Sequence, residues 1–270
     1  MMDASIQNRL DSIISEVKKK TGINIDTLKP AFLERRIQYR MRILGISSFD
    51  GYLKVLSTET TEAKDLYKSF SINVTKFFRD PHVWDTFSCD ILTRLDSQIR
   101  FSPIRAWSCG CASGEEPYSI SIMLANFLKN KKYSYEIFAT DISLDALEFA
   151  KNGIYREENL VNVKPEVKSE HFEKTPENTY KINSKAKNQV QFFRLDMLKN
   201  SGKLFDIIFC RNVLIYYDKN GHEQIFKKFH ESLKKDGFLV IGQDESMIGT
   251  EASKLFDLVL PKERIYKKIS

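Results

Sequence analysis

The sequence predicts a two-part α/β protein. A small all-helical N-terminal domain is expected before a doubly wound, mostly parallel sheet that carries an antiparallel C-terminal hairpin. From residue 103 onward, short apolar runs alternate with helical patterns, which is typical of a parallel sheet covered by helices on both faces. Before residue 80, apolar residues recur at helical spacing. We therefore expect two domains, 1–80 and 81–270.

Composition places the chain among ordinary globular proteins, with 42% hydrophobic and 29% charged residues. No stretch approaches the roughly 18 apolar residues of a membrane span, and the N-terminus lacks a signal-peptide layout, so we expect a cytoplasmic protein without membrane insertion. The four cysteines are too few and too scattered for a disulfide framework, and reduced thiols are expected. Cys109-x-Cys111 and the histidines form no ligand pattern, so no metal is expected.

The N-terminal part predicts a series of helices. Leu10, Ile13, Ile14 and Val17 follow helical spacing before Gly22. Further helical patterns cover residues 28–44, 48–56 and 60–72, and a long one begins after Pro81. The net charge of the chain is +6 and much of the basic excess lies before residue 80. A partner of this part is therefore expected to be acidic.

The C-terminal part predicts the strands of the sheet. They are expected at IRAWSC, YEIFAT, VQFFRL, FDIIFC and GFLVIG, with helices at 115–130, 143–151 and 218–235. FDLVL and RIYKKI are expected to form the terminal hairpin. Between Gly153 and Gln189 the pattern lapses, and either a small β excursion or an ordered loop fits this segment.

The turn after the first strand predicts a ligand site. Small residues from Gly110 to Gly114 let a ligand approach the backbone at the carboxyl end of the sheet. The turn is not the GxGxxG of a dinucleotide fold, and Glu115 and Glu116 occupy the helix start where a pyrophosphate would need free N–H groups. A cationic group, such as an ammonium or a sulfonium, fits these carboxylates better. The alternative is that both glutamates only complement the helix dipole.

Polar residues follow the next strands. Asp141 can accept hydrogen bonds from both hydroxyls of a ribose, or it can cap the following helix. Asp196 can receive the exocyclic amine of an adenine, or it is a plain turn residue. Asn212, with Tyr216 and Tyr217 after it, leaves the strand FDIIFC at the same edge and can shape a methyl-transfer site.

A further cluster precedes the sheet, in NVTKFFRD at residues 73–80. By itself, the pair Phe77 and Phe78 fits a packed junction between helices, and Arg79 fits a solvated charge.

Four motifs together resemble those of a known family. NVTKFFRD, WSCGCASGEEPYSI, ATDIS followed by FAKNGIYR, and FCRNVLIYYD are similar to the signature series of the chemotaxis receptor methyltransferase (CheR) family. They come in the family's order and spacing, from about residue 30 to the end of the chain. The resemblance implies a helical domain, an α/β domain that binds S-adenosylmethionine, and an inserted antiparallel β-subdomain.

The resemblance also implies an activity and a partner. Members of the family esterify particular glutamate side chains on chemoreceptors, which leaves S-adenosylhomocysteine as the product. The expected partner is the cytoplasmic domain of methyl-accepting chemoreceptors, with no nucleic acid, and the protein is expected to be a monomer.

Site residues follow from the resemblance position by position. Asn73, Thr75 and Arg79 are expected to border the cofactor and the substrate, and Glu115 or Glu116 is expected to hold the methionine part. Asp141 would then hold the ribose. The other expected cofactor contacts are Asp196 and Met197 beside the adenine, and Asn212 and Val213, which close the site. Tyr216 falls where the family keeps a tyrosine next to the transferred methyl group.

Two recognition elements are implied as well. The helix LERRIQYRMR is similar to the family's basic helix, so Arg35, Arg36, Arg40 and Arg42 are expected to bind the acidic methylation region of the receptor. Residues 165–190 take the place of the β-subdomain, which in some members docks a tethering peptide of the receptor. Because HFEKTPENTYKIN has no glycine at the expected turn, no use of such a tether is expected.

The expected chemistry is an in-line displacement by a carboxylate oxygen on the sulfonium methyl group. A glutamate with a pKa near 4.3 is ionised at neutral pH, so no general base is required. We expect Arg79 to hold the substrate carboxylate and Tyr216 to orient the reacting oxygen. The alternatives are a methyltransferase acting on nucleic acid or on another protein, an NAD-dependent reductase, and a silent binding module.

Overall fold

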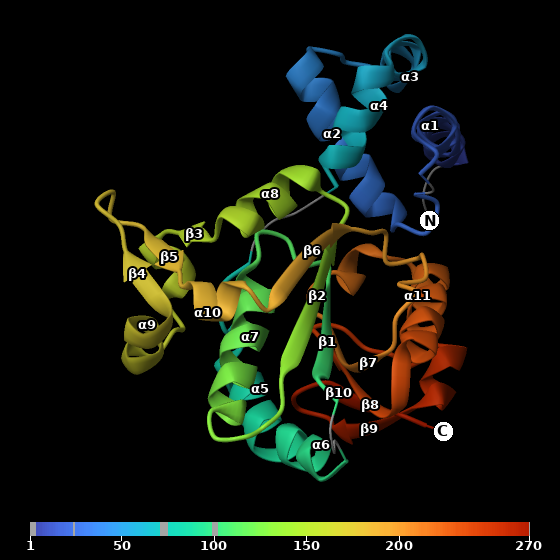
Figure 1. The fold of residues 1–270 in the computed structure, drawn as a ribbon. Helices are drawn as coiled ribbons and strands as arrows, with labels where there is room; N and C mark the ends of the chain where they lie inside the picture. The colour runs from blue at the N-terminus through green and yellow to red at the C-terminus, as the bar shows by residue number, and fades with distance from the viewer. Residues whose placement is uncertain (1–3, 24, 71–74, 99–101, 270) are drawn as a thin grey trace. The chain divides into compact units, whose positions relative to one another are not determined.

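The computed structural model describes residues 4–23, 25–70, 75–98 and 102–269 (Figure 1). The chain forms two compact units. One comprises the described residues of Met1–Ile72 together with Tyr216–His222, and the other comprises those of Asn73–Ile215 and Glu223–Ser270. Asn73, an expected cofactor contact, lies outside the described residues.

The helical unit contains α1 (Ala4–Thr21), α2 (Pro30–Leu44), α3 (Phe49–Thr58) and α4 (Thr60–Lys68). Local signals explain their ends. Pro30 opens α2, Gly45 closes it at a φ of 68°, and the Ser48 side chain accepts a hydrogen bond from the Gly51 N–H at the start of α3. The predicted helices of this part are confirmed, and their apolar stripes meet in one core that includes Leu10, Ile13, Val17, Leu33, Ile37 and Met41.

A short segment from much later in the sequence completes this unit. The Asp218 N–H donates to the Thr27 carbonyl at 2.8 Å, and Tyr217 forms a bridge with Leu28. Gly221 lies so close to Thr27 that an added Cβ would be 2.9 Å from the Thr27 carbonyl oxygen. Residues 216–222 therefore belong structurally with the N-terminal helices, which nothing in the local sequence indicates.

The α/β unit is built on a seven-stranded sheet in the order β6-β2-β1-β7-β8-β10-β9. The parallel strands are β1 (Ile104–Cys109), β2 (Tyr135–Asp141), β6 (Val190–Arg194), β7 (Phe205–Cys210) and β8 (Leu233–Ile241). β9 (Phe256–Leu260) and β10 (Ile265–Lys268) form the antiparallel edge. The predicted sheet and its terminal hairpin are confirmed. Every residue of β7 is buried, as expected for a central parallel strand.

Helices cover both faces of this sheet (Figure 1). The ring of Phe209 on β7 stacks on Trp84 of α5 (Pro81–Thr86) at a centroid distance of 5.3 Å. On the other face, Trp107 of β1 packs edge-on against Phe229 of α11 (Lys219–Ser232) at 5.6 Å. Further helices of this unit are α6 (Leu92–Gln98), which follows a π-helical turn at Phe87–Ile91, α7 (Glu115–Leu128) and α8 (Leu144–Asn152).

A separate three-stranded antiparallel sheet forms the insertion. Its order is β3-β5-β4, with β3 (Ile154–Tyr155), β4 (Phe172–Lys174) and β5 (Tyr180–Ile182), and α9 (Pro165–His171) and α10 (Ser184–Lys187) flank it. β3 comes from before the expected segment 165–190.

The β4–β5 turn closes without a glycine because Asn178 adopts a φ of 57°, a conformation that asparagine tolerates better than most residues. The absence of glycine therefore does not prevent the turn, and the expectation that no tether is used loses this support and stays a prediction.

Short 3₁₀ turns connect several elements, at Glu157–Leu160, Leu214–Tyr216 and Glu251–Leu255. All four cysteines are free thiols, and Cys109, Cys111 and Cys210 are buried. Among the described helices, none combines the length and the apolar character that crossing a membrane requires.

Candidate cofactor site

The predicted ligand-binding loops lie at one edge of the sheet. β6, β2, β1 and β7 are neighbours and run parallel, so the residues that follow them meet at their carboxyl ends. These residues are the turn Gly110–Gly114, Asp141, Asp196 and Asn212. The structure therefore brings together the four strand-end positions that the sequence singled out.

The glycines of the first turn make room for protein rather than for a ligand. A Cβ on Gly110 would lie 2.6 Å from a methyl group of Val213, and Gly110 has a φ of 77°. A Cβ on Gly114 would lie 2.8 Å from both Ala150 and the Tyr155 hydroxyl. Val213 therefore closes against the turn itself. Between the two glycines, Ala112 adopts a φ of 46° and donates its N–H to Asp141 Oδ2 at 2.9 Å.

Glu115 is committed to the protein. Its side chain is buried, with Oε2 accepting from the Ser113 hydroxyl at 2.6 Å and Oε1 from the Asn159 amide at 2.9 Å. Burial raises the pKa of Glu115 to about 7, against the opposing effect of these hydrogen bonds. Because Glu115 is only 1% exposed and its two oxygens already bind neighbouring side chains, a ligand has little access to this carboxylate.

Glu116 differs from its neighbour. Its Oε1 accepts from the Ser108 hydroxyl at 2.7 Å, and part of the Glu116 residue remains exposed to solvent. Desolvation raises the pKa of Glu116 to about 7, while the charges of Arg211 and Arg79 lower it. A ligand ammonium would supply the positive charge that favours the ionised form. The geometry thus favours Glu116 over Glu115 as the residue facing a cationic ligand.

Asp141 fixes two loops and keeps capacity for a ligand. Its Oδ2 accepts from Ala112 and its Oδ1 accepts from the Ser143 N–H, both at 2.9 Å. Burial raises its pKa, against the opposing effect of the backbone N–H bonds. The cap of α8 is Ser143, whose side chain accepts from the Ala146 N–H, so the capping alternative for Asp141 is wrong. Each carboxylate oxygen has a further acceptor site that a ribose hydroxyl can use.

Asp196 and Met197 follow β6 as predicted. Asp196 Oδ1 accepts from the Leu198 N–H at 3.0 Å, which is the behaviour of a turn residue. Met197 is buried, whereas Asp196 is partly exposed. Both the turn role and the proposed contact with an adenine amine are compatible with this arrangement, since a carboxylate has several acceptor sites.

Arg79 sits in a strained turn that other residues hold in place. Phe78 and Asp80, on either side of it, have φ values of 48° and 55°. The Arg79 carbonyl accepts from the Trp84 indole N–H at 2.8 Å and from the Arg211 guanidinium at 2.9 Å. Arg211 also donates to Asp80 Oδ2 at 2.6 Å. The backbone of Arg79 is therefore fixed from two directions. Thr75, earlier in the same segment, is partly buried.

The loop after β7 is held by a buried carboxylate. Glu245 accepts the backbone N–H groups of Gly242 at 2.5 Å, Asn212 at 3.1 Å and Ile215 at 3.3 Å. Burial raises the pKa of Glu245, and these N–H groups oppose the rise. Asn212 has a φ of 60°, and its side-chain Oδ1 is buried without a partner in the structure. An unsatisfied buried acceptor at this edge is a position where a ligand donor can be accommodated.

Backbone strain concentrates at this edge. Non-glycine residues in the left-handed region cost about 1–3 kcal/mol each and persist where the surroundings enforce them. Four such residues occur in the segments around the strand ends and the Arg79 turn: Phe78, Asp80, Ala112 and Asn212. The other described non-glycine residues with a positive φ, including Asn178, lie outside these segments. Such clustering is typical of functional sites.

Tyr216 and the four arginines of α2 belong to the helical unit. The Tyr216 ring packs on Phe32 at 4.7 Å, and its carbonyl accepts from the Lys29 N–H. Arg35 and Arg42 are exposed, and Arg36 lies over the Phe32 ring at 5.5 Å. The expected roles of these residues in binding the substrate stay predictions.

Arg40 has a different partner from the one expected. Its guanidinium donates to both carboxylate oxygens of Glu62, at 3.0 and 2.6 Å, and Glu62 also accepts from the Tyr52 hydroxyl at 2.6 Å. Glu62 is only 3% exposed. Arg40 therefore serves to neutralise a buried carboxylate inside the helical unit, which leaves it poorly placed to bind a receptor.

Sequence reasoning missed three residues of the site. Arg211, Glu245 and Asn159 each hold a candidate ligand-binding residue or its loop. Arg211 carried a usable signal, because a charged residue directly after a predominantly apolar strand requires a partner when it is buried. Glu245 and Asn159 lie in segments without periodicity, and nothing in the sequence indicates their contacts.

Two family models together match most of the chain. The model described as the all-alpha domain of CheR methyltransferase matches residues 8–71, and that described as the SAM binding domain of CheR methyltransferase matches residues 73–260. The chain belongs to the CheR methyltransferase family.

Curated relatives agree with this assignment. A chemotaxis protein methyltransferase of Borreliella burgdorferi is 33% identical over 97% of this chain and 94% of its own length. The protein of the same name from Escherichia coli is 32% identical over 85% of this chain and 81% of its own. A chemotaxis protein methyltransferase of Listeria monocytogenes is 32% identical over 86% of this chain and 87% of its own length.

The CheR assignment makes the chain a methyltransferase that uses S-adenosylmethionine, and the site residues fit that molecule. Its ammonium and sulfonium groups are cationic and suit the carboxylates at the sheet edge, while its ribose hydroxyls suit Asp141. Within the described ranges, no group of three or more His, Cys, Asp or Glu side chains is arranged to hold a metal ion.

Proposed function

We propose that this CheR family member transfers a methyl group from S-adenosylmethionine to glutamate side chains on the cytoplasmic domain of chemoreceptors, which forms glutamyl methyl esters for sensory adaptation. The observation that carries the proposal is the match of both family models in sequence order, with chemotaxis protein methyltransferases aligned over nearly the whole chain. We place the reaction in the cytoplasm, with the enzyme as a monomer.

The cofactor roles follow from the contacts at the sheet edge. Glu116 pairs with the ammonium of the methionine part, Asp141 accepts the ribose hydroxyls, and Asp196 accepts the adenine amine beside Met197. The partial exposure of Glu116 and the near-complete burial of Glu115 support this division. The remaining contacts in the proposal come from Asn73, Thr75, Arg79, Asn212 and Val213.

The transfer itself needs alignment more than proton chemistry. S-adenosylmethionine supplies an activated methyl group on a sulfonium, and the substrate glutamate is already ionised at neutral pH because its ordinary pKa is near 4.3. Arg79 presents a guanidinium to the substrate carboxylate, which sets the approach of the attacking oxygen to about 3–3.5 Å. Tyr216 orients that oxygen. The doubly anchored carbonyl of Arg79 supports its role because a fixed backbone pre-organises the side chain.

The basic helix α2 recognises the receptor. Its exposed Arg35 and Arg42, with Arg36 between them in sequence, complement an acidic substrate helix. Arg40 is excluded from this set because Glu62 binds it.

Incubation of host membranes with methyl-labelled S-adenosylmethionine tests the proposal. We expect the enzyme to label membrane protein, and the label to be released by mild base, as a methyl ester requires. Peptide mapping should place the ester on glutamates of a chemoreceptor. Base-stable label on nucleic acid, or on a protein other than a receptor, would reject it.

A further inference from the structure

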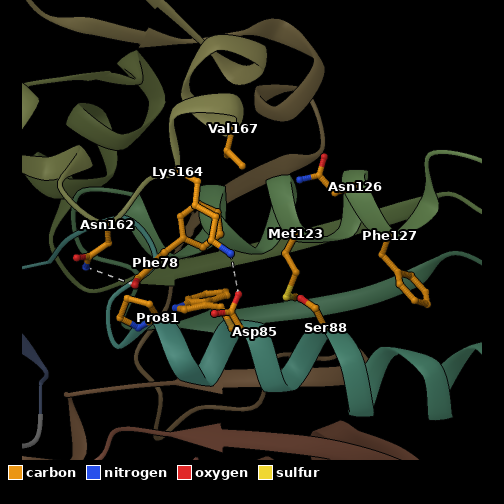
Figure 2. Close-up of a pocket in the computed structure, with 11 residues that line it drawn as sticks. Phe78, Pro81, Asp85, Ser88, Met123, Asn126, Phe127, Asn162, Lys164 and Val167 are labelled. Carbon is orange, nitrogen blue, oxygen red and sulfur yellow. Dashed lines mark hydrogen bonds and ion pairs between the residues drawn. The ribbon is translucent and has the colours of Figure 1, made fainter.

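A pocket separate from the expected cofactor contacts lies within the α/β unit. It has a volume of about 310 Å³, which is at the lower end of the range for sites that bind small organic molecules. Its walls come from α5, from α7 and from the segment leading into α9 (Figure 2). None of the expected cofactor contacts lines it.

Part of the pocket lining is apolar and rich in aromatic rings. Phe78, Trp84, Met123, Phe127 and Val167 line it. Trp84 is held firmly, because its ring stacks on Phe209 and meets Phe78 edge-on at a centroid distance of 5.5 Å. Such a wall favours a flat or branched apolar group.

The opening of the pocket carries one positive and one negative charge. Lys164 and Asp85 reach toward each other from opposite walls, with Nζ 3.2 Å from Oδ1 (Figure 2). Their side chains are 66% and 64% exposed, and an ion pair this exposed contributes little to stability. The pair can therefore separate at little cost. Two carboxamides also line the pocket: that of Asn126, which is exposed, and that of Asn162, whose N–H donates to the Phe78 carbonyl at 3.4 Å (Figure 2).

These features together indicate the charges and the side chain of a suitable ligand. A carboxylate would satisfy Lys164, an ammonium on the same molecule would satisfy Asp85, and an apolar side chain would fill the ring-lined wall. A molecule with a single charge would leave one member of the pair without its partner. We propose that this pocket binds a free α-amino acid with an aromatic or a branched apolar side chain.

The pocket touches the element that holds Arg79. Trp84 donates its indole N–H to the Arg79 carbonyl, and Phe78 is the residue before Arg79. An occupant would thus contact two side chains of the strained turn. Trp84 also provides a readout, because the chain has two tryptophans and the other, Trp107, is fully buried on the opposite face of the sheet.

Tryptophan fluorescence of the full chain tests the ligand class. L-phenylalanine and L-leucine are titrated in saturating S-adenosylhomocysteine, so that the cofactor site cannot account for the signal. We expect saturable binding at least tenfold tighter than that of 3-phenylpropionate or phenethylamine, which each carry one charge. Absence of binding, or equal binding of the single-charge compounds, would overturn the proposal. So would equal binding of an N-acetylated peptide amide with an internal phenylalanine, because the occupant would then be a peptide side chain.

Variants measured by calorimetry test the location. Val167→Trp fills the pocket and should weaken phenylalanine binding at least tenfold, whereas Val161→Trp, at a residue 65% exposed and outside the lining, should leave it unchanged. Asp85→Asn and Lys164→Gln should each weaken binding several-fold. Retained affinity for S-adenosylhomocysteine shows that each variant is folded. Unchanged phenylalanine binding in folded Val167→Trp would place the site elsewhere and reject the proposal.

Discussion

Glu115 and Glu116 show how two identical neighbours acquire different roles. Both have a pKa raised to about 7 by burial. Glu115 has partners on both oxygens, whereas Glu116 has the Ser108 hydroxyl on one and lies within the influence of Arg211 and Arg79. Because the helix start alone would treat them alike, their surroundings decide which one can serve a ligand.

This difference predicts a pH dependence of cofactor binding. A ligand ammonium favours ionised Glu116, which in the free protein is mostly protonated below its pKa of about 7. Binding should therefore release a proton and tighten as pH rises. We expect the affinity for S-adenosylhomocysteine to increase about tenfold from pH 6 to pH 8, as ionisation with such a pKa requires. Calorimetry in buffers of different ionisation enthalpy measures both the affinity and the number of protons released on binding.

Substitutions assign this effect to one glutamate. Glu116→Gln should bind weakly and with little dependence on pH, whereas Glu115→Gln should keep the wild-type slope. A flat affinity profile for the wild type would contradict the role of Glu116.

Arg79 gives a second prediction at the same scale. Arg79→Ala should abolish methyl transfer, because no guanidinium then positions the substrate carboxylate, and it should leave the affinity for S-adenosylhomocysteine within a few fold. Initial rates and calorimetry separate the two effects. Arg79→Lys should recover only part of the rate, since an ammonium lacks the fork of a guanidinium. Full activity of the alanine variant would reject the role of Arg79.

At the scale of elements, the turn after β1 depends on a close contact with the loop after β7. Gly110→Ala places a Cβ 2.6 Å from Val213 and forces alanine to a φ of 77°. We expect a loss of about 2 kcal/mol in the free energy of unfolding, from overpacking and backbone strain, and weaker cofactor binding. Urea denaturation measures the change in the free energy of unfolding.

The double variant Gly110→Ala/Val213→Ala separates these two causes. Its loss in the free energy of unfolding should be smaller than the sum of the losses of the two single variants, because removing the Val213 methyl groups relieves the steric clash. The part of the loss that comes from backbone strain at Gly110 should remain. Strict additivity of the two substitutions would show that the contact does not matter.

The helices and strands could be predicted from the sequence, whereas the long-range contacts that join them could not. Apolar runs such as FDIIFC and the stripe Leu10, Ile13 and Val17 predicted strands and helices because burial requires that spacing. The strand-end residues were predictable because parallel strands bring their ends together. The contacts of Arg211 and Glu245 were not, since they join residues 131 and 33 positions apart. The pairing of residues 216–222 with the N-terminal helices was hidden for the same reason.

At the scale of the whole molecule, the helical unit uses its basic residues for two different purposes. In the helical unit, Arg40 neutralises the buried Glu62, whereas Arg35 and Arg42 are exposed. A family pattern alone assigns all of them to the receptor. The structure separates a stabilising arginine from arginines available for recognition.

This separation predicts opposite phenotypes. Arg40→Ala leaves Glu62 buried without its partner and should lower the free energy of unfolding by about 3 kcal/mol. Arg35→Ala should leave stability unchanged but raise the KM for receptor several-fold with kcat retained, and the increase should shrink at high salt. Denaturation and receptor methylation at two salt concentrations provide the comparison. A stable Arg40→Ala protein with impaired receptor binding would reverse the assignment.

The central claim is that the carboxylates at the strand ends of the α/β unit form the binding site for the methyl donor. Calorimetric titration of the full chain with S-adenosylhomocysteine tests it most directly. We expect one site per chain, and a loss of affinity of at least tenfold in Asp141→Asn and in Glu116→Gln with the fold retained by circular dichroism. No binding by the folded wild type, or unchanged affinity in both variants, would contradict the account.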